Sequence, residues 1–314
     1  MPISTTGPLS YGMQLPIQSQ SPVFAEGWEA AAGPADLAEI ARTADRAGFA
    51  YLASCDHVAI PRRLADAMGT VWYDPVATLS FLAGITERVL LMSHVAIVGL
   101  RHPLATAKQY ATLDRLCGGR LVLGVGAGHV AEEFEALGAD FDGRGGLLDE
   151  TVDALRAALG PEEFPEFAGK RFSFSGLGQL PRPAQDRVPV WVGGSSPAAV
   201  RRAAVRGDGW LPQGDPRERL PAQIARLKRL REAAGIGTPI VVGAITEPLY
   251  VGDPRWHVGR RTLSGRPEAV AESLRAYRDM GVHQIQVRFR SRSRGELTDQ
   301  MAAFAAEVAP HLGN

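Results

Sequence analysis

Short apolar runs alternate with longer amphipathic stretches along most of the chain, and this alternation constrains the fold more than any other feature. Runs rich in Val, Ile and Leu are typical of buried parallel strands, and amphipathic stretches are typical of the helices that connect them. Eight strands are expected, at 10–15, 50–54, 89–97, 120–125, 188–193, 208–211, 239–244 and 283–288. Eight helices are expected, at 34–47, 74–86, 103–116, 145–159, 197–206, 217–234, 267–279 and 298–309. This eightfold alternation predicts an α/β fold, a (β/α)8 TIM barrel, rather than an open doubly wound sheet.

Proline supports several of the expected helix starts. A proline in the first turn of a helix is tolerated because the N–H that it lacks has no partner inside the helix. The sequence therefore predicts that helices begin near Pro34, Pro75, Pro103, Pro197 and Pro267.

Length and composition limit the classes of protein that need to be considered. The chain has 314 residues, 45% of them hydrophobic and 22% charged, and a single barrel domain over 1–314 accounts for this length. Lys and Arg number 34, as do Asp and Glu, so no basic face for nucleic acid or for a membrane is expected and the partner is a small-molecule substrate. We also expect a homodimer.

The cysteines and the N-terminus bear on the cellular compartment. Cys55 and Cys117 are the two cysteines of the chain, too few for a disulfide framework or a four-cysteine zinc site. No export signal and no run of apolar residues long enough to span a bilayer is recognised. A reducing cytoplasm is therefore expected.

Long connections indicate where a site lies. The segments 55–73, 128–146 and 245–266 each follow the end of an expected strand, and long ordered loops are more often functional than not. Because the strands are parallel, these three loops are expected to extend the C-terminal mouth of the barrel, where barrel enzymes keep their active sites. A fourth long segment, 160–187, precedes a strand.

Histidines at strand ends are the first candidates for chemistry. Asp56 and His57 close the second expected strand, and a carboxylate beside an imidazole is suited to proton transfer near neutral pH. A turn-forming Asp and a surface His explain the same pattern equally well. His94 interrupts the apolar third strand, either as a hydrogen-bonded core residue or as a catalytic one. No spacing typical of a metal site is present, and no metal is expected.

Glycines follow two further strands. Gly124, Gly126 and Gly128 are spaced G-x-G-x-G before His129, which does not fit a dinucleotide-binding fingerprint and instead predicts a surface on which a flat ring lies against the backbone. The segment Gly193-Gly194-Ser195-Ser196 precedes a helix with Arg201 and Arg202, and predicts a phosphate site at the helix N-terminus. A plain helix cap explains one serine but not the glycine pair. Replacing Gly193 with Val is expected to weaken cofactor binding and to leave the fold intact.

Taken together and in order, these motifs resemble the luciferase-like monooxygenase superfamily over about residues 10–290, and within it the deazaflavin-dependent oxidoreductases that use coenzyme F420. The resemblance is carried by Cys55-Asp56-His57 with Pro61, Tyr73-Asp74-Pro75, Arg101-His102-Pro103, 113–120 (LDRLCGGR), 124–128 (GVGAG), Glu132-Glu133-Phe134, 189–194 (PVWVGG) and 207–210 (GDGW).

The resemblance implies a role for each matched position. Asp56 would meet the polar edge or side chain of the cofactor, and His57, or His129 at the rim, would donate or accept a proton at the reactive face. His94 and Val95 would be joined by a cis peptide bond that presses on the back of the ring. The remaining cofactor contacts implied are Ala127 and Gly128 at the ring edge, and Gly193, Gly194, Ser195 and Ser196 at the phosphate.

Three functions follow from this reading. The leading one is hydride transfer between F420 and a small organic substrate. The alternatives are an FMN-dependent monooxygenase and a barrel that binds a flavin without turnover. The sugar-phosphate dehydrogenases of the superfamily have a Glu at the position of His129 and a Trp shortly after His57, where this chain reads Val58-Ala-Ile-Pro-Arg-Arg63, which argues against sugar-phosphate oxidation.

Overall fold

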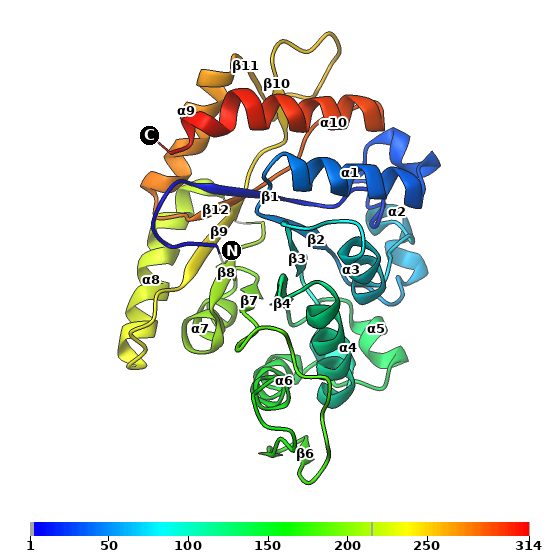
Figure 1. The fold of residues 1–314 in the computed structure, drawn as a ribbon, viewed down its shortest axis with the longest axis vertical. Helices are drawn as coiled ribbons and strands as arrows, with labels where there is room; N and C mark the ends of the chain where they lie inside the picture. The colour runs from blue at the N-terminus through cyan, green and yellow to red at the C-terminus, as the bar shows by residue number, and fades with distance from the viewer. Residues whose placement is uncertain (1–2, 215, 314) are drawn as a thin grey trace.

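The fold, seen in a computed structural model that describes residues 3–214 and 216–313, is a closed barrel of parallel strands. Around the barrel the strands follow the order β1-β12-β9-β8-β7-β4-β3-β2 and every neighbouring pair is parallel (Figure 1). The predicted (β/α)8 barrel is confirmed, and each strand falls within or next to its predicted range. The barrel strands are β1 (Ser10–Gln14), β2 (Tyr51–Ser54), β3 (Leu90–Ser93), β4 (Leu121–Val125), β7 (Val190–Gly193), β8 (Gly209–Leu211), β9 (Val241–Ile245) and β12 (Gln284–Val287).

Helices cover the outside of the barrel, and proline begins five of them as predicted. These are α1 (Pro34–Arg46), α3 (Pro75–Ala83), α4 (Pro103–Leu116), α7 (Pro197–Arg206) and α9 (Pro267–Asp279). The others are α6 (Arg144–Ala158), α8 (Leu220–Ala233) and α10 (Arg294–Ala303).

The last helix begins earlier than the predicted 298–309. Ser293 is its N-cap and accepts a hydrogen bond from the Glu296 N–H at 3.1 Å, which fixes the start at Arg294. After α10 the chain continues through a π-helical turn at Phe304–Val308 and a 3-10 turn at Ala309–His311. The apolar pattern located the helix, but its first three residues, Arg294–Glu296, include no apolar side chain that would mark the start.

Apolar side chains fill both sides of the barrel wall. One buried cluster lies between the strands and the surrounding helices, and a second lies inside the barrel. The interior cluster takes alternate residues from successive strands, as expected when side chains of a strand point alternately to its two faces. Its members are Tyr51, Ala53, Leu90, Met92, Val122, Trp191, Leu211 and Val241. The barrel interior is thus packed, and chemistry has to take place at one of its ends.

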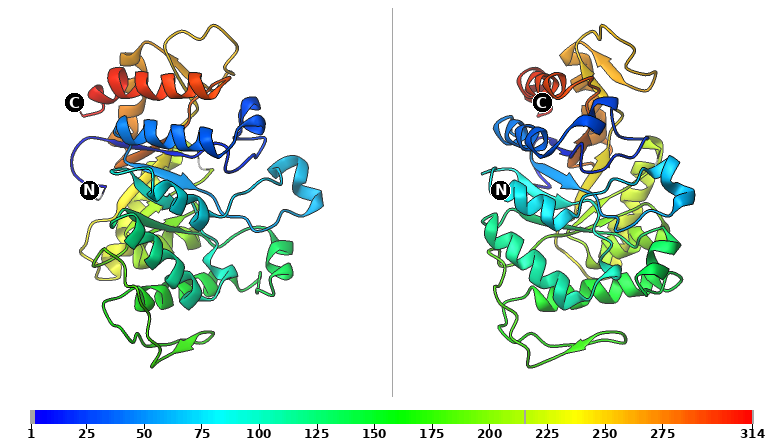
Figure 2. Two further views of the ribbon diagram at one scale, coloured as in Figure 1. Left: turned by 45° about the vertical axis from the view of Figure 1, so that its right-hand side comes forward. Right: turned by 90° about the vertical axis from the view of Figure 1, so that its right-hand side faces the viewer.

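Smaller elements decorate the loops. The helices α2 (Ala65–Met68) and α5 (Ala131–Ala136) follow β2 and β4, and Figure 2 shows both on the same side of the barrel. A parallel pair, β10 (Leu249–Val251) and β11 (Leu263–Gly265), follows β9. The antiparallel pair β5 (Phe167–Ala168) and β6 (Ser173–Phe174) lies in the segment that leads from α6 to β7. The three loops predicted at the mouth therefore contain α2, α5 and the β10–β11 pair.

In the described part of the chain, no helix is long and apolar enough to cross a membrane.

Candidate active site at the C-terminal mouth of the barrel

A cis peptide bond joins His94 to Val95 directly after β3, as the resemblance implied. The chain then returns to the barrel wall, where the Ala96 N–H donates to the Gly124 carbonyl at 2.8 Å. The prediction of one continuous strand over 89–97 is wrong beyond Ser93, because the cis bond interrupts the regular alternation. The resulting bulge lies at the C-terminal end of β3, at the barrel mouth.

Two glycines make room for the side chain of Val95. A Cβ atom on Gly126 would lie 2.3 Å from Cγ2 of Val95, and a Cβ on Gly193 would lie 2.6 Å from Cγ1. Both distances are far shorter than carbon atoms tolerate. These glycines were predicted to let a cofactor approach the backbone, but their first role is to accommodate the bulge. The expectation that Gly193→Val leaves the fold intact is therefore wrong.

Asp56 supports the bulge from the neighbouring strand. Its side chain is buried and accepts hydrogen bonds from the Ile97 N–H at 2.8 Å and from Arg101 at 2.7 and 2.9 Å. Both carboxylate oxygens are thus engaged within the protein. Asp56 fixes the chain just after Val95, and its contact with a cofactor stays a prediction.

His57 forms a buried pair with Glu133, a residue that was not among the predicted site residues. The His57 Nδ1 atom lies 3.1 Å from Oε2 of Glu133, and the exposed fractions of the two side chains are 8% and 0%. The other Glu133 oxygen accepts the N–H groups of Val58 and Ala59. A short helix, α5, therefore carries a carboxylate from the β4 loop to the β2 loop.

The Glu133 carboxyl is held ionised. Burial raises its pKa, but the hydrogen bonds from His57, Val58 and Ala59 outweigh burial and leave the pKa below its ordinary value. Its sequence neighbour Glu132 points elsewhere and pairs with Arg63. The sequence did indicate an acidic residue here, because Glu132 and Glu133 both belong to the matched Glu132-Glu133-Phe134 motif. Sequence spacing does not show which of the two side chains faces inward.

Two aromatic rings flank His57. Its ring meets Trp72 edge-on at a centroid distance of 4.6 Å and His129 at 5.4 Å. The structure thus brings the two predicted catalytic histidines together. Trp72 comes from the same loop as His57, although the sequence just after His57 contains no Trp.

The two histidines differ in their surroundings. Burial, followed by the proximity of His57, lowers the pKa of His129. His129 is therefore neutral at pH 7, whereas His57 lies directly against an ionised carboxylate.

His94 faces β8. Its Nε2 lies 3.1 Å from the amide nitrogen of Gln213, while its Nδ1 is buried without a hydrogen-bond partner among the described residues. Burial lowers the pKa of His94 to about 4, so the ring is neutral at pH 7. An unpaired buried nitrogen beside the bulge is an atom that a bound molecule would satisfy.

This pKa predicts an acid-sensitive fold. Because the folded pKa lies below the unfolded value, the unfolded state binds more protons between about pH 6.5 and 4, and stability is lost as the pH falls through that window. We expect His94 to account for about 2 kcal/mol of the stability lost between pH 7 and pH 5. Urea unfolding of the wild type and of His94→Gln across this range measures the difference, and parallel curves for the two proteins would contradict it.

The predicted phosphate segment forms a turn between β7 and α7. Gly194 adopts φ 101°, which favours glycine, and its carbonyl accepts a hydrogen bond from the Trp210 indole at 2.9 Å. Ser195 Oγ donates to the Gln213 carbonyl and accepts from the Gln213 N–H, both at 2.9 Å.

Ser196 is the N-cap of α7, and its hydroxyl oxygen accepts a hydrogen bond from the Ala199 N–H at 3.1 Å. The Ser196 hydroxyl only accepts in this contact, so it can still donate a hydrogen bond to an anion. The Ser195 hydroxyl already donates to the Gln213 carbonyl.

The arginines of α7 do not complete this turn. Arg202 is buried against α6, where it donates to Asp149 at 2.7 Å and to the Gly145 carbonyl at 2.8 Å. Arg201 is exposed. The positive end of α7, rather than an arginine pair, is what the turn offers to a phosphate.

Ala127 and Gly128 lie between the bulge and α5. Gly128 has φ 76°, and a Cβ atom there would lie 2.6 Å from the ring of Phe134. Ala127 is half-buried and packs on the outer core. The backbone at these positions is tightly confined, and their contact with a ring edge stays a prediction.

A metal centre is not evident: no three His, Cys, Asp or Glu side chains within 3–214 and 216–313 are grouped to hold an ion.

The fold and this site define a class: a parallel (β/α)8 barrel whose mouth carries a backbone bulge, a buried histidine–glutamate pair and the N-terminus of α7. Residues 11–255 match the family model of the luciferase-like monooxygenases. The chain therefore belongs to the luciferase-like monooxygenase family. A relative from Mycobacterium tuberculosis, itself described as uncharacterized, is 32% identical over 221 residues, 66% of this chain and 75% of the relative.

Solved structures share the fold over nearly the whole chain. A monooxygenase from Streptomyces bottropensis has a TM-score of 0.78 with 23% identity, covering 96% of this chain and 99% of its own. An F420-dependent secondary alcohol dehydrogenase, solved with an F420-acetone adduct, has a TM-score of 0.77 with 16% identity, covering 98% and 100%. A riboflavin lyase solved with modified FMN has a TM-score of 0.77 with 16% identity, covering 96% and 91%. At these identities the likeness establishes the barrel fold only.

Ser196 allows a test of the anion site. Replacing it with Ala removes the cap of α7 and lowers stability by about 1 kcal/mol. If its hydroxyl also meets a phosphate, affinity for a phosphate-bearing cofactor falls several-fold as well. Ser293→Ala is the matched control, because it removes the cap of α10 by the same chemistry. Equal cofactor affinity in the two variants, measured by titration, would assign Ser196 to capping alone.

Proposed function

We propose that this protein binds coenzyme F420 at the barrel mouth and transfers a hydride between this deazaflavin and a small organic substrate. The observation that carries the proposal is the buried His57–Glu133 pair beside the Val95 bulge. A hydride transfer to or from a carbonyl or alcohol also moves a proton, and this pair is built to manage one.

The residues present fit a cofactor with a flat ring and a phosphate. The ring would lie against Val95 with its edge near Ala127 and Gly128, and His94 Nδ1 would find there the partner that it lacks inside the protein. The phosphate would lie at the turn formed by Gly193, Gly194, Ser195 and Ser196, which combines close backbone approach with a helix N-terminus. When bound, the deazaflavin supplies the carbon that gives or takes the hydride.

His57 moves the proton in this proposal. Its Nδ1 faces Glu133, so Nε2 is the ring atom left for a substrate oxygen. The ionised Glu133 stabilises the imidazolium form and fixes the ring orientation. Trp72 restricts the ring from a second side, and neutral His129 from a third. His57 is thereby held ready to donate or accept a proton.

The mouth favours a substrate with an apolar body. Several large apolar side chains are exposed in the loops after β1 and β2 and at the end of β9. The β1 and β2 loops are adjacent, since the Gln20 N–H donates to the Val71 carbonyl at 3.1 Å. Ile245 faces the barrel axis, because it shares the parity of the interior residue Val241. The exposed set is Val23, Phe24, Val58, Val71 and Ile245.

Cofactor titration tests the proposal. The purified protein is titrated with F420 and, in parallel, with FMN, and binding is measured by fluorescence and by the rise in thermal stability. We expect F420 to bind more tightly, and bound F420 to be reduced by a secondary alcohol or reduced F420 to be oxidised by an unsaturated carbonyl compound. Tighter binding of FMN, with incorporation of oxygen from O2 into a substrate when the FMN is supplied in its reduced form, would instead establish the monooxygenase. Tight binding without any turnover would establish a flavin-binding protein.

A further inference from the structure

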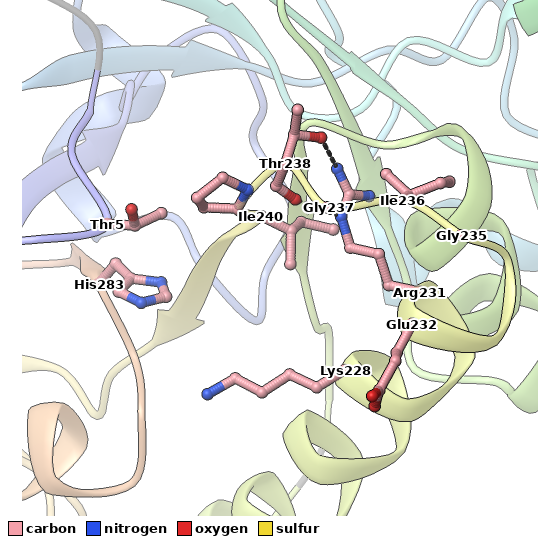
Figure 3. A pocket seen from close by; sticks show the side chains of 11 residues that line it. Thr5, Lys228, Arg231, Glu232, Gly235, Ile236, Gly237, Thr238, Ile240 and His283 are labelled. Atoms are coloured by element: carbon pink, nitrogen blue, oxygen red, sulfur yellow. Dashed lines mark hydrogen bonds between the residues drawn. The ribbon is translucent and has the colours of Figure 1, made fainter.

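A pocket of about 460 Å³, whose lining is seen in Figure 3, lies outside the His57 site. It is formed by the last turns of α8, the following segment 235–240 that leads to β9, and His283 just before β12. Strands of a parallel barrel all begin at the same end, so this pocket lies at the N-terminal end and the His57 site at the C-terminal end. Its volume is within the range of small-molecule sites, and no role proposed above uses it.

Two nitrogen donors face this pocket. Figure 3 shows the Lys228 side chain extending from α8 toward His283. Lys228 is exposed, and it forms no hydrogen bond or ion pair with another described residue. The Nδ1 atom of His283 accepts the Val242 N–H at 2.9 Å, which places the proton of the neutral ring on Nε2. Burial, and then the charge of Lys228, lowers the pKa of His283, so the two groups are electrostatically close.

The neighbouring charges leave the pocket positive. Arg231 is buried and donates only to uncharged oxygens, those of Thr238, Ala204 and Gly207, at 2.7 to 3.0 Å. The acidic residue of the lining is Glu232, whose side chain does not extend toward His283 as that of Lys228 does (Figure 3). Two cations with one carboxylate attract an anion.

We propose that this pocket binds a small organic anion. Its carboxylate or phosphate group would accept hydrogen bonds from Lys228 Nζ and His283 Nε2. Its apolar body would lie against the remaining wall, which is formed largely by Ile236, Pro239 and Ile240. The proposal is independent of the cofactor at the mouth, since no lining residue of this pocket belongs to the His57 site.

Benzoate and benzamide are the probes for this proposal, because they share a ring and differ in charge. Benzoate binding to the full chain is measured by calorimetry, with and without saturating cofactor. Lys228→Gln is expected to weaken binding about tenfold, as expected for loss of a charge-assisted hydrogen bond. Arg229→Gln is the matched control, since it removes a charge from the next, exposed position of the same helix, outside the pocket lining.

A steric variant tests the location independently of charge. Gly237 lines the pocket, a Cβ atom there would meet nothing within 4 Å, and its φ is not in the left-handed region, so Gly237→Leu adds a large side chain at the pocket wall without strain. It is expected to abolish benzoate binding and to leave cofactor binding unchanged. The proposal is overturned if benzoate fails to bind at millimolar concentration, if benzamide binds equally well, if Lys228→Gln and Arg229→Gln behave alike, or if bound cofactor displaces benzoate.

Discussion

Replacing His57 with Asn is expected to lower turnover by about 10²–10⁴-fold, the range for loss of a general acid or base. Asn occupies part of the ring volume and keeps a polar group near Glu133, but it does not exchange a proton near neutral pH. The fold and the affinity for cofactor should change little, because Glu133 also holds the N–H groups of Val58 and Ala59. Turnover with saturating cofactor and substrate is the measurement.

His129→Asn is the matched control for this variant. His129 lies 5.4 Å from His57 between ring centroids, yet it has no contact with Glu133 like that of His57. Its replacement should reduce turnover much less. If His57→Asn is fully active and His129→Asn is not, the proton-transfer role belongs to His129.

Glu133→Gln tests whether Glu133 acts on His57 through its negative charge or only by holding the loop in place. The amide oxygen still accepts the loop N–H groups, but it no longer stabilises an imidazolium, and it permits the wrong ring tautomer. We expect turnover to fall by about tenfold or more, and to fall little further when Glu133→Gln is combined with His57→Asn, because Glu133 acts through His57. If Glu133 had a purely structural role, Glu133→Gln would lower the residual activity of His57→Asn as much as it lowers that of the wild type.

The barrel could be predicted because its determinants are local. Each strand is a short apolar run, and proline marks the first turn of helices such as α3 and α7. Parallel strands then place every strand end at one mouth, so Asp56, His94 and Gly193 could be assigned to a common region before any distance was known.

The contacts within the mouth could not be predicted in this way. Glu133 reaches His57 across 76 positions of sequence, and Gln213 reaches His94 across 119. Such pairings depend on how short elements like α5 are placed, and α5 is too short to carry a periodic signal. The cis bond at Val95 has no local signature either, and only the resemblance to a family pointed to it.

Gly126 and Gly193 were correctly assigned to the barrel mouth, but the reason predicted for them was incomplete. A glycine at a strand end fits both a ligand against the backbone and a neighbouring side chain, and the sequence does not separate the two. At Gly126 and Gly193 the neighbour is Val95. The bulge thus depends on three strands, since Val95 follows β3 and its side chain packs against one glycine that follows β4 and another that ends β7.

This arrangement predicts that Gly126→Ala destabilises the protein by about 3 kcal/mol, at the upper end of the range for overpacking a core. The added Cβ would lie 2.3 Å from Cγ2 of Val95, and Val95 has no flexible end that can move aside. Gly193→Ala, with a Cβ 2.6 Å from Cγ1, should destabilise by a similar or smaller amount. Both variants should also weaken cofactor binding, because the displaced bulge is the surface proposed to support the ring.

Val95→Ala should rescue both variants. Without its Cγ atoms, residue 95 presents only Cβ, at 3.4 Å from the new atom on residue 126 and 3.6 Å from that on residue 193, which are ordinary contacts. The double variants should therefore be less destabilised than the sum of the single ones by at least about 1 kcal/mol. Urea unfolding of the two double-mutant cycles measures this coupling. Additive free energies of unfolding would show that the glycines are needed for some reason other than Val95, whereas a rescue of stability without a rescue of cofactor affinity would show that the side chain of Val95 itself supports the ring.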